Sequence, residues 1–226
     1  HPREIGDAHP IWEFLAGHTG LTAAGVRARK IITEISRTDT TKRKDILIQA
    51  FGQVHKKHPD TLLVVTIDVD HDPLGLILTD MIQSAGVDGS VAVLGSVWEQ
   101  LPDIYAVTDI YCMPSIMEGF GMAPQEAAAT RVPVVSSDLV PYVVEYLLGS
   151  DVEDVSYGEA GDRRLKLGAG AIVVPADDVT GFSRAIEMLL ADPDLRAGLG
   201  DRAYTATIPY FTWDNMVKLF LEGIGG

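Results

Sequence analysis

The chain has 226 residues, of which 46% are hydrophobic, and its formal net charge is −14. The length suits one domain or a domain and a half, and the hydrophobic content is sufficient for a buried core, which argues against disorder. The negative charge argues against nucleic acid or an anionic membrane as the main partner, because both require clustered lysine and arginine.

Residues 1–27 fit no regular pattern apart from one apolar patch at 11–15. We interpret 1–27 as a lead-in segment or linker from an N-terminal domain that is missing or truncated. His9 and His18 lie in this segment, and a surface position is expected for both histidines.

From about residue 28, short β-branched runs alternate with amphipathic runs of helical length. The expected strands are almost continuous in apolar residues, as strands covered on both faces are, and span 30–35, 62–67, 91–94, 110–113, 132–135 and 171–174. The expected helices span 44–58, 75–86, 97–108, 122–130, 141–149, 181–190 and 194–206. This alternation predicts a doubly wound α/β domain over 28–210, with a mainly parallel six-stranded sheet and helices on both faces. Ligands bind beyond the carboxyl ends of such strands, so the segments that follow the strands are the candidate site.

A concentration of basic residues follows the first expected strand. Four of the 18 basic residues fall within 37–44, among them Arg37 and Lys42. A guanidinium and an ammonium group there would neutralise a bound diphosphate and stabilise the extra negative charge that it carries as a leaving group. Taken alone, the pattern fits a solvated turn better.

Two further segments have simpler interpretations. Asp68 and Asp70 have the spacing of a metal-binding pair, but acidic residues at strand ends are common turn formers, so no metal site is predicted. Cys112 is the single cysteine and lies in an apolar run, which predicts a buried, inert thiol. One cysteine also excludes an intrachain disulfide and agrees with a cytoplasmic location. The apolar stretches are well under the roughly 20 residues that span a bilayer, so no transmembrane segment is expected.

The most informative segment follows the fourth expected strand and covers 114–129. It passes through Gly119 and Gly121 into an alanine-rich helix. Glycine lets backbone N–H groups approach a ligand, which favours an anion site suited to a diphosphate. Glu118 in the loop and Glu126 in the helix offer carboxylates to sugar or ribose hydroxyls. Two glutamates eight apart are ordinary surface charge in an acidic chain, and only the strand–glycine–helix context favours a site.

The last part of the chain contains two further predictions. Residues 150–168 are charged and glycine-rich and are interpreted as a surface insertion within the domain. Residues 211–226 are predicted to form a C-terminal helix that packs back toward the N-terminal domain.

Together these motifs resemble the family-4 retaining glycosyltransferases of the GT-B fold. The basic segment precedes the motif P-S-I-M-E-G-F-G-M-A-P-Q-E-A-A-A, which is similar to the E-x7-E signature of that family. The similarity continues through 132–136 and covers about 28–222, the Rossmann-like C-terminal domain. Residues 70–75 are similar to a segment of sucrose-phosphate-synthase-like and trehalose-synthase-like members.

The resemblance implies a role for each matching position. Arg37 and Lys42 are expected to hold the diphosphate of the donor, and Glu118 to face the transferred sugar. Glu126 is expected to bind the ribose. The remaining contacts are assigned to the backbone, with the sugar and phosphates at Gly119, Phe120, Gly121 and Met122 and the base at Gly95 and Val97. Transfer in the family is metal-independent, so no cofactor is implied beyond a UDP-, GDP- or ADP-hexose as co-substrate.

Two positions depart from the family pattern. Arg131 stands where a glycine is usual, and 138–142 replaces the expected G-G-x-x-E segment, so sugar contacts from that loop are not carried over.

The resulting hypothesis is a hexosyltransferase that transfers a sugar to a hydroxyl acceptor with retention of configuration, and this chain is its donor-binding part. The alternative is a non-catalytic nucleotide-sugar-binding or assembly subunit. A sugar epimerase of the same fold is disfavoured by the motif.

Overall fold

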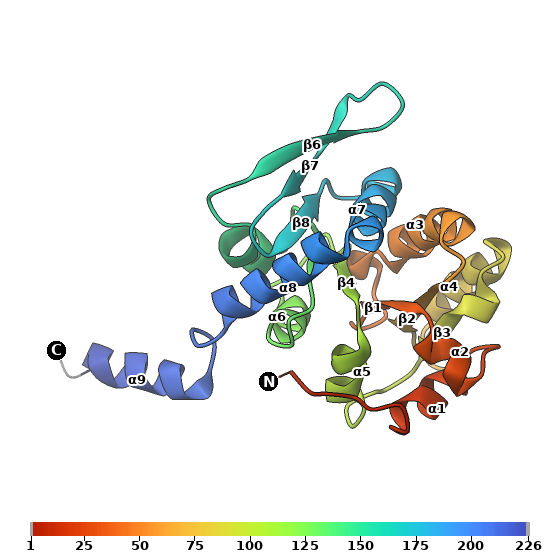
Figure 1. Ribbon diagram of the computed structural model, residues 1–226, viewed down its shortest axis with the longest axis horizontal. Helices are drawn as coiled ribbons and strands as arrows, with labels where there is room; N and C mark the ends of the chain where they lie inside the picture. Colours follow the sequence, from red (N-terminus) through yellow and green to blue (C-terminus); the bar gives the residue numbers. More distant parts are fainter. Residues whose placement is uncertain (1, 225–226) are drawn as a thin grey trace.

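Within residues 2–224, which the computed structural model describes, eight strands form one sheet in the order β3-β2-β1-β4-β5-β8-β7-β6 (Figure 1). Six of them run parallel and correspond to the predicted strands: β1 Lys30–Glu34, β2 Thr61–Thr66, β3 Val91–Leu94, β4 Ile110–Met113, β5 Val134–Ser137 and β8 Ala171–Val174. The predicted doubly wound, mainly parallel α/β fold is confirmed.

The sheet is larger than predicted because the segment 150–168 is not an irregular insertion. It contains β6, Glu153–Tyr157, and β7, Arg163–Leu167, which form an antiparallel hairpin. β7 pairs with β8 and extends the sheet. The hairpin was missed because most of its side chains are exposed and charged, so its sequence lacks the apolar runs that marked the other strands.

Six of the seven helices predicted between residues 44 and 207 are α-helices in the structure. They are α3 Lys44–Lys57, α4 Pro73–Ser84, α5 Leu101–Val107, α6 Met122–Ala128, α7 Val179–Ala191 and α8 Pro193–Thr207. The predicted helix 141–149 is centred on a π-helical turn, η3, Val143–Leu147. The short 3₁₀ turns η1, Thr40–Lys42, and η2, Asp88–Ser90, precede α3 and β3.

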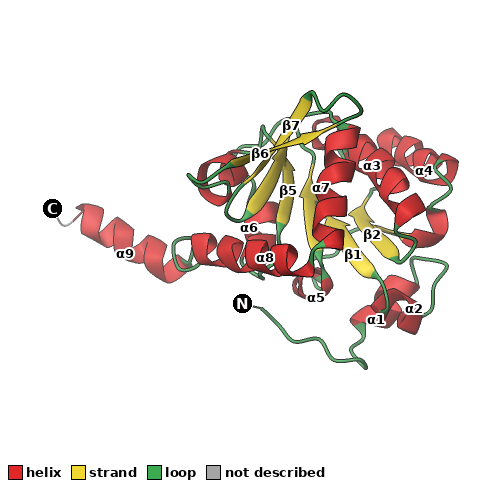
Figure 2. Ribbon diagram, turned by 45° about the horizontal axis from the view of Figure 1, so that its top comes forward, coloured by secondary structure: helices red, strands yellow, loops and turns green. Residues whose placement is uncertain are grey.

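Alternating residues of the strands send their side chains to two cores, because successive side chains point to opposite faces. Ile32 and Leu63 pack with α3, α4 and α7 on one face. Ile31 and Leu62 pack on the other face, where α5 lies, and α6 and α8 cover the same face further along the sheet. Figure 2 shows α3 and α4 on one side of the sheet and α5 on the other.

The first part of the chain also packs on this second face. It forms α1, Ile11–Ala16, and α2, Ala23–Arg27. The side chains of Leu15 and Val26 are fully buried against the sheet. The segment interpreted as a lead-in therefore contributes to the core.

The last helix, α9, Trp213–Ile224, extends away from the rest of the molecule in both views (Figures 1 and 2). Its apolar side chains are exposed, with Phe220 67% and Trp213 86% accessible. Among the described helices, none combines the length and the apolar character needed to cross a membrane.

Candidate functional site

The order of the strands brings two of the predicted loops together. From β1 the chain winds through β2 and β3 toward one edge of the sheet, and it then returns to place β4 on the other side of β1. The carboxyl ends of β1 and β4 therefore flank the switch point, where α/β sheets have their ligand crevice. Arg37 follows β1, and Glu118 follows β4.

Hydrogen bonds through Thr41 join these two loops. The backbone N–H of Ile116 donates to the Thr41 carbonyl at 2.8 Å, and the Ser115 hydroxyl donates to the same oxygen at 3.0 Å. Thr41 is itself fixed by Asp39, which accepts from its N–H and its hydroxyl at 2.7 Å each. These two bonds lower the pKa of Asp39. The turn that presents Lys42 is thus attached to the loop of Glu118.

Lys42 and Glu118 are in direct contact. Lys42 Nζ donates to Glu118 Oε1 at 2.5 Å, and their side chains are only 10% and 13% exposed. Because the pair is largely buried, little water screens the attraction between the two charges, and each group orients the other. Two residues selected from separate motifs therefore lie together at the base of one cleft.

The glycine turn has a conformation that requires glycine at one position. Gly121 has φ +109°, and a Cβ atom placed there would lie 2.8 Å from Val140 Cγ1. The turn is held from behind, because the N–H of Tyr142 donates to the Phe120 carbonyl at 2.8 Å. Met122 then begins α6. The segment 138–142, which departs from the family pattern, thus supports the turn.

The cations and the glycine turn share one cavity of about 490 Å³, which we call the loop cavity. Its lining is Ile35, Ser36, Arg37, Lys42, Met113, Glu118, Gly119, Phe120, Gly121, Met122 and Ala123. Arg37, Lys42 and the turn therefore face a common space.

A second cavity of about 430 Å³, the helix cavity, shares five lining residues with the first, Ile35, Ser36, Arg37, Met122 and Ala123. It is lined further by Thr66, Gly95, Ser96, Val97, Trp98, Leu101, Tyr105 and Glu126. The predicted base-side and ribose-side residues therefore surround one space, next to the space that holds the cations.

Glu126 is held by a residue that the sequence did not assign to the site. Tyr105 Oη donates to Glu126 Oε2 at 3.1 Å and lies against the Ala123 carbonyl at 3.3 Å. Although Glu126 is exposed overall, burial of its carboxyl group in the wall raises its pKa, and the bond from Tyr105 opposes that rise. Burial raises the pKa of Tyr105 as well. No role was predicted for Tyr105 from the sequence, because its contact with Glu126 joins two helices that are far apart in the sequence.

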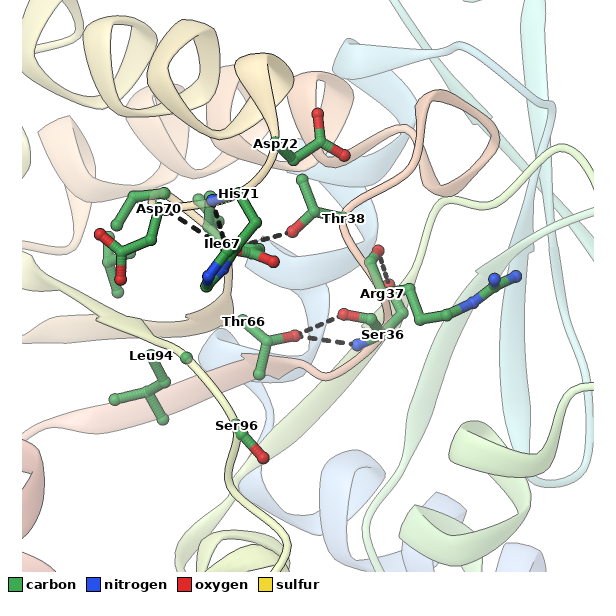
Figure 3. Close-up of a pocket in the computed structure, with 14 residues that line it drawn as sticks. Ser36, Arg37, Thr38, Thr66, Ile67, Asp70, His71, Asp72, Leu94 and Ser96 are labelled. Carbon is green, nitrogen blue, oxygen red and sulfur yellow. Dashed lines mark hydrogen bonds and ion pairs between the residues drawn. The ribbon is translucent and has the colours of Figure 1, made fainter.

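A third cavity of about 580 Å³, the aspartate cavity, lies beyond the ends of β1, β2 and β3. Figure 3 shows Asp70 and His71 at one side of it and Arg37 pointing away from them. Asp68 accepts from the backbone and the ring of His71 at 3.0 Å, and these bonds lower its pKa. Asp68 thus has the turn-forming contacts that were expected. In the part of the chain that is described, no group of three or more His, Cys, Asp or Glu residues is arranged to hold a metal ion.

Cys112 is fully buried in β4, as predicted. Burial raises the pKa of its thiol far above the usual value, so the reactive thiolate is disfavoured.

Residues 26–206 match the family described as "Glycosyl transferases group 1". The lipopolysaccharide core biosynthesis mannosyltransferase LpcC of Rhizobium leguminosarum bv. viciae is 30% identical over 193 residues, which are 83% of this chain and 48% of that protein. The chain spans about half the length of the curated relatives that it matches.

The fold is similar to the folds of solved structures. The Anabaena protein HepE in complex with UDP-glucose has a TM-score of 0.76 at 18% identity, and the match covers 99% of this chain and 54% of that one. The C-terminal domain of the group 1 glycosyl transferase LpcC from Francisella tularensis has a TM-score of 0.67 at 20% identity, covering 81% of this chain and 87% of that one.

Proposed function

Because the chain belongs to the group 1 glycosyl transferases, we propose that it is the donor-binding part of a retaining hexosyltransferase. Its substrate is an NDP-hexose, and a hydroxyl group of the acceptor replaces the nucleoside diphosphate on the sugar. The observation that carries the proposal is the loop cavity, in which Arg37 and Lys42 face the same space as the glycine turn.

The cations supply the chemistry that the departing diphosphate requires. As the bond from the sugar to the phosphate breaks, negative charge grows on the phosphate oxygens. A guanidinium and an ammonium group that face the phosphates stabilise this charge more than the charge of the bound donor. Lys42 is pre-oriented by Glu118, which also lies beside the expected position of the transferred sugar. This arrangement is proposed to work without a metal ion.

The helix cavity is proposed to hold the nucleoside. Glu126 accepts hydrogen bonds from the ribose hydroxyls, and backbone groups at Gly95 and Val97 contact the base. UDP, GDP and ADP all remain candidates for the nucleotide, and the sucrose-phosphate-synthase-like branch remains a prediction.

The acceptor half is proposed to lie in the portion of the relatives that this chain does not match, which is about half of their length. The exposed apolar side of α9 suits packing against that N-terminal domain, as predicted for 211–226. A cytoplasmic location is part of the same proposal.

One observation favours the second candidate, a nucleotide-sugar-binding subunit without catalysis. The segment 138–142 holds the glycine turn in place of the expected glycine-rich loop, through Tyr142 and Val140. If that loop is essential for handling the sugar, the chain binds a donor without transferring it. Sugar transfer by the complete protein from a bound donor separates the two candidates.

The proposal is tested by titrating the chain with UDP, GDP and ADP in a calorimeter. One of the three is expected to bind, and Arg37→Ala is expected to weaken it by about ten- to a hundredfold, as for loss of a charged hydrogen bond of roughly 1.5–3 kcal/mol. Arg184→Ala is the matched control, since Arg184 is exposed on α7 and lines none of the three cavities. Absence of binding at millimolar concentration, or equal effects of the two variants, contradicts the proposal.

A further inference from the structure

A buried ion pair lies beneath the loop that carries Arg37. Glu34 ends β1 and Lys44 begins α3, and their side chains are 0% and 1% exposed. Lys44 Nζ donates to Glu34 Oε2. Neither residue lines the loop, helix or aspartate cavity, so a ligand bound there does not touch them.

Hydrogen bonds to Ser36 connect the ion pair with the loop that carries Arg37. Lys44 Nζ also donates to the Ser36 carbonyl at 3.2 Å and to its hydroxyl at 2.9 Å. From the other side, Thr66 of β2 accepts from the Ser36 N–H at 3.0 Å and donates to its carbonyl at 2.6 Å. Figure 3 shows Ser36 and Thr66 side by side, with Arg37 directed away. The residue before Arg37 is therefore held between a helix and a strand.

The pair has features that stability alone does not explain. Among the described residues, Glu34 Oε1 is the buried side-chain oxygen that has no hydrogen-bond partner. A cation at the first position of α3 opposes the helix dipole. Replacing a buried ion pair by apolar residues of similar volume is often neutral or stabilising in other proteins. Each of these features weighs against a purely structural role.

We propose that Glu34 and Lys44 are positioning residues: they fix the Ser36 peptide so that the Arg37 guanidinium faces the shared cleft before a ligand arrives. The inference rests on the proposed function in one respect, namely that the ligand of Arg37 is a diphosphate. A loop whose backbone is ordered in advance loses less freedom on binding, so the pair raises affinity for the phosphates without contacting them.

The test is the double variant Glu34→Leu/Lys44→Met, which fills the same space without buried charge. It is expected to unfold within a few degrees of the parent chain. Its affinity for the preferred nucleoside diphosphate is expected to fall about tenfold or more, while its affinity for the matching nucleoside, measured by NMR titration, stays the same. The ¹⁵N order parameters of Ser36 and Arg37 are expected to fall from the rigid range toward about 0.6, with those of α3 unchanged.

The matched control is Lys57→Met/Glu187→Leu, which removes a surface ion pair between α3 and α7 with an N···O distance of 2.7 Å. It is expected to change neither affinity nor order at Ser36. Three results overturn the inference: a double variant that does not fold, one that binds the diphosphate like the parent, or one in which Ser36 and Arg37 stay rigid. A parent chain that binds no nucleotide counts against the proposed function alone, because the order parameters still decide the positioning role.

Discussion

Two opposing effects act on the pKa of Glu126. Burial in the cavity wall raises its pKa, and the hydrogen bond from Tyr105 lowers it, with burial the larger effect. Ribose hydroxyls donate best to an ionised carboxylate, so protonation of Glu126 weakens the acceptor that the proposed function requires. The pH at which this happens lies above that of an ordinary glutamate.

The affinity for the nucleoside diphosphate is therefore expected to fall as the pH is lowered from neutral toward the raised pKa of Glu126, where this carboxylate takes up its proton. Protonation of the ligand's own phosphate contributes to the same trend. Glu126→Gln is the control, because it lacks the titrating carboxyl group and retains only the phosphate contribution. Calorimetry over this range checks the difference, and parallel curves for the two proteins would show that Glu126 does not bind the ribose.

The predicted residues of the site were found by type and by position after strands, but their contacts were beyond the sequence. Arg37 and Lys42 were identified as a local excess of positive charge, and Glu118 by its place before the glycine turn. The contact of Lys42 with Glu118 depends on hydrogen bonds to one carbonyl, that of Thr41, which no composition or spacing reveals. The roles of these residues stay predictions.

The end of α6 shows how two elements adapt to an unusual residue. Arg131 adopts the left-handed conformation, with φ +67°, that a glycine usually occupies. Its guanidinium pairs with Asp201 at 2.8 Å and lies 4.9 Å from the Tyr204 ring centre, and both partners belong to α8. The close approach depends on Gly200, where a Cβ atom would lie 2.1 Å from the Arg131 carbonyl oxygen.

Gly200→Ala is therefore expected to destabilise the chain by roughly 1–3 kcal/mol, because backbone must move to admit the methyl group. Gly198→Ala lies in the same helix, and its Cβ meets the movable end of the Arg202 side chain at 3.1 Å. That variant is expected to gain up to about 1 kcal/mol from helix propensity. Thermal or urea unfolding measures both, and similar effects of the two substitutions would contradict the packing argument.

The prediction of elements was most accurate where a strand is apolar and buried. The bounds of β3, β4 and β8 agree with the prediction to the residue. The expected helix 97–108 begins later, at Leu101, with Pro102 in its first turn, where the missing N–H and fixed φ of proline are tolerated. The hairpin of β6 and β7 was missed because its side chains are mostly exposed and charged, so no local apolar pattern marks it, although β7 pairs with the next strand along the chain, β8.

In the molecule as a whole, helix α9 leaves its apolar side chains largely exposed. The side chains of α9 at Trp213, Met216, Val217 and Phe220 recur at helical spacing and are between 52% and 86% exposed. The α/β domain buries its own core without them.

Replacing Met216 and Phe220 by serine is accordingly expected to leave the unfolding temperature of this chain almost unchanged, since exposed side chains contribute little to folding. Leu199→Ala, a substitution at a fully buried position, is the contrasting control and is expected to cost about 2–5 kcal/mol. Calorimetric melting tests both. A large loss from the serine substitutions would mean that α9 packs on the domain in solution.

The hairpin places an acidic strand, β6, at one edge of the sheet. An edge strand exposes a row of unpaired N–H and C=O groups that can pair with a strand of another molecule. Here that outermost strand is β6, which carries Glu153 and Asp154 in the open. A second molecule that approaches this border meets carboxylates first, and it brings its own surplus charge, since each chain carries −14. Mutual repulsion therefore discourages edge-to-edge pairing of two molecules at this border.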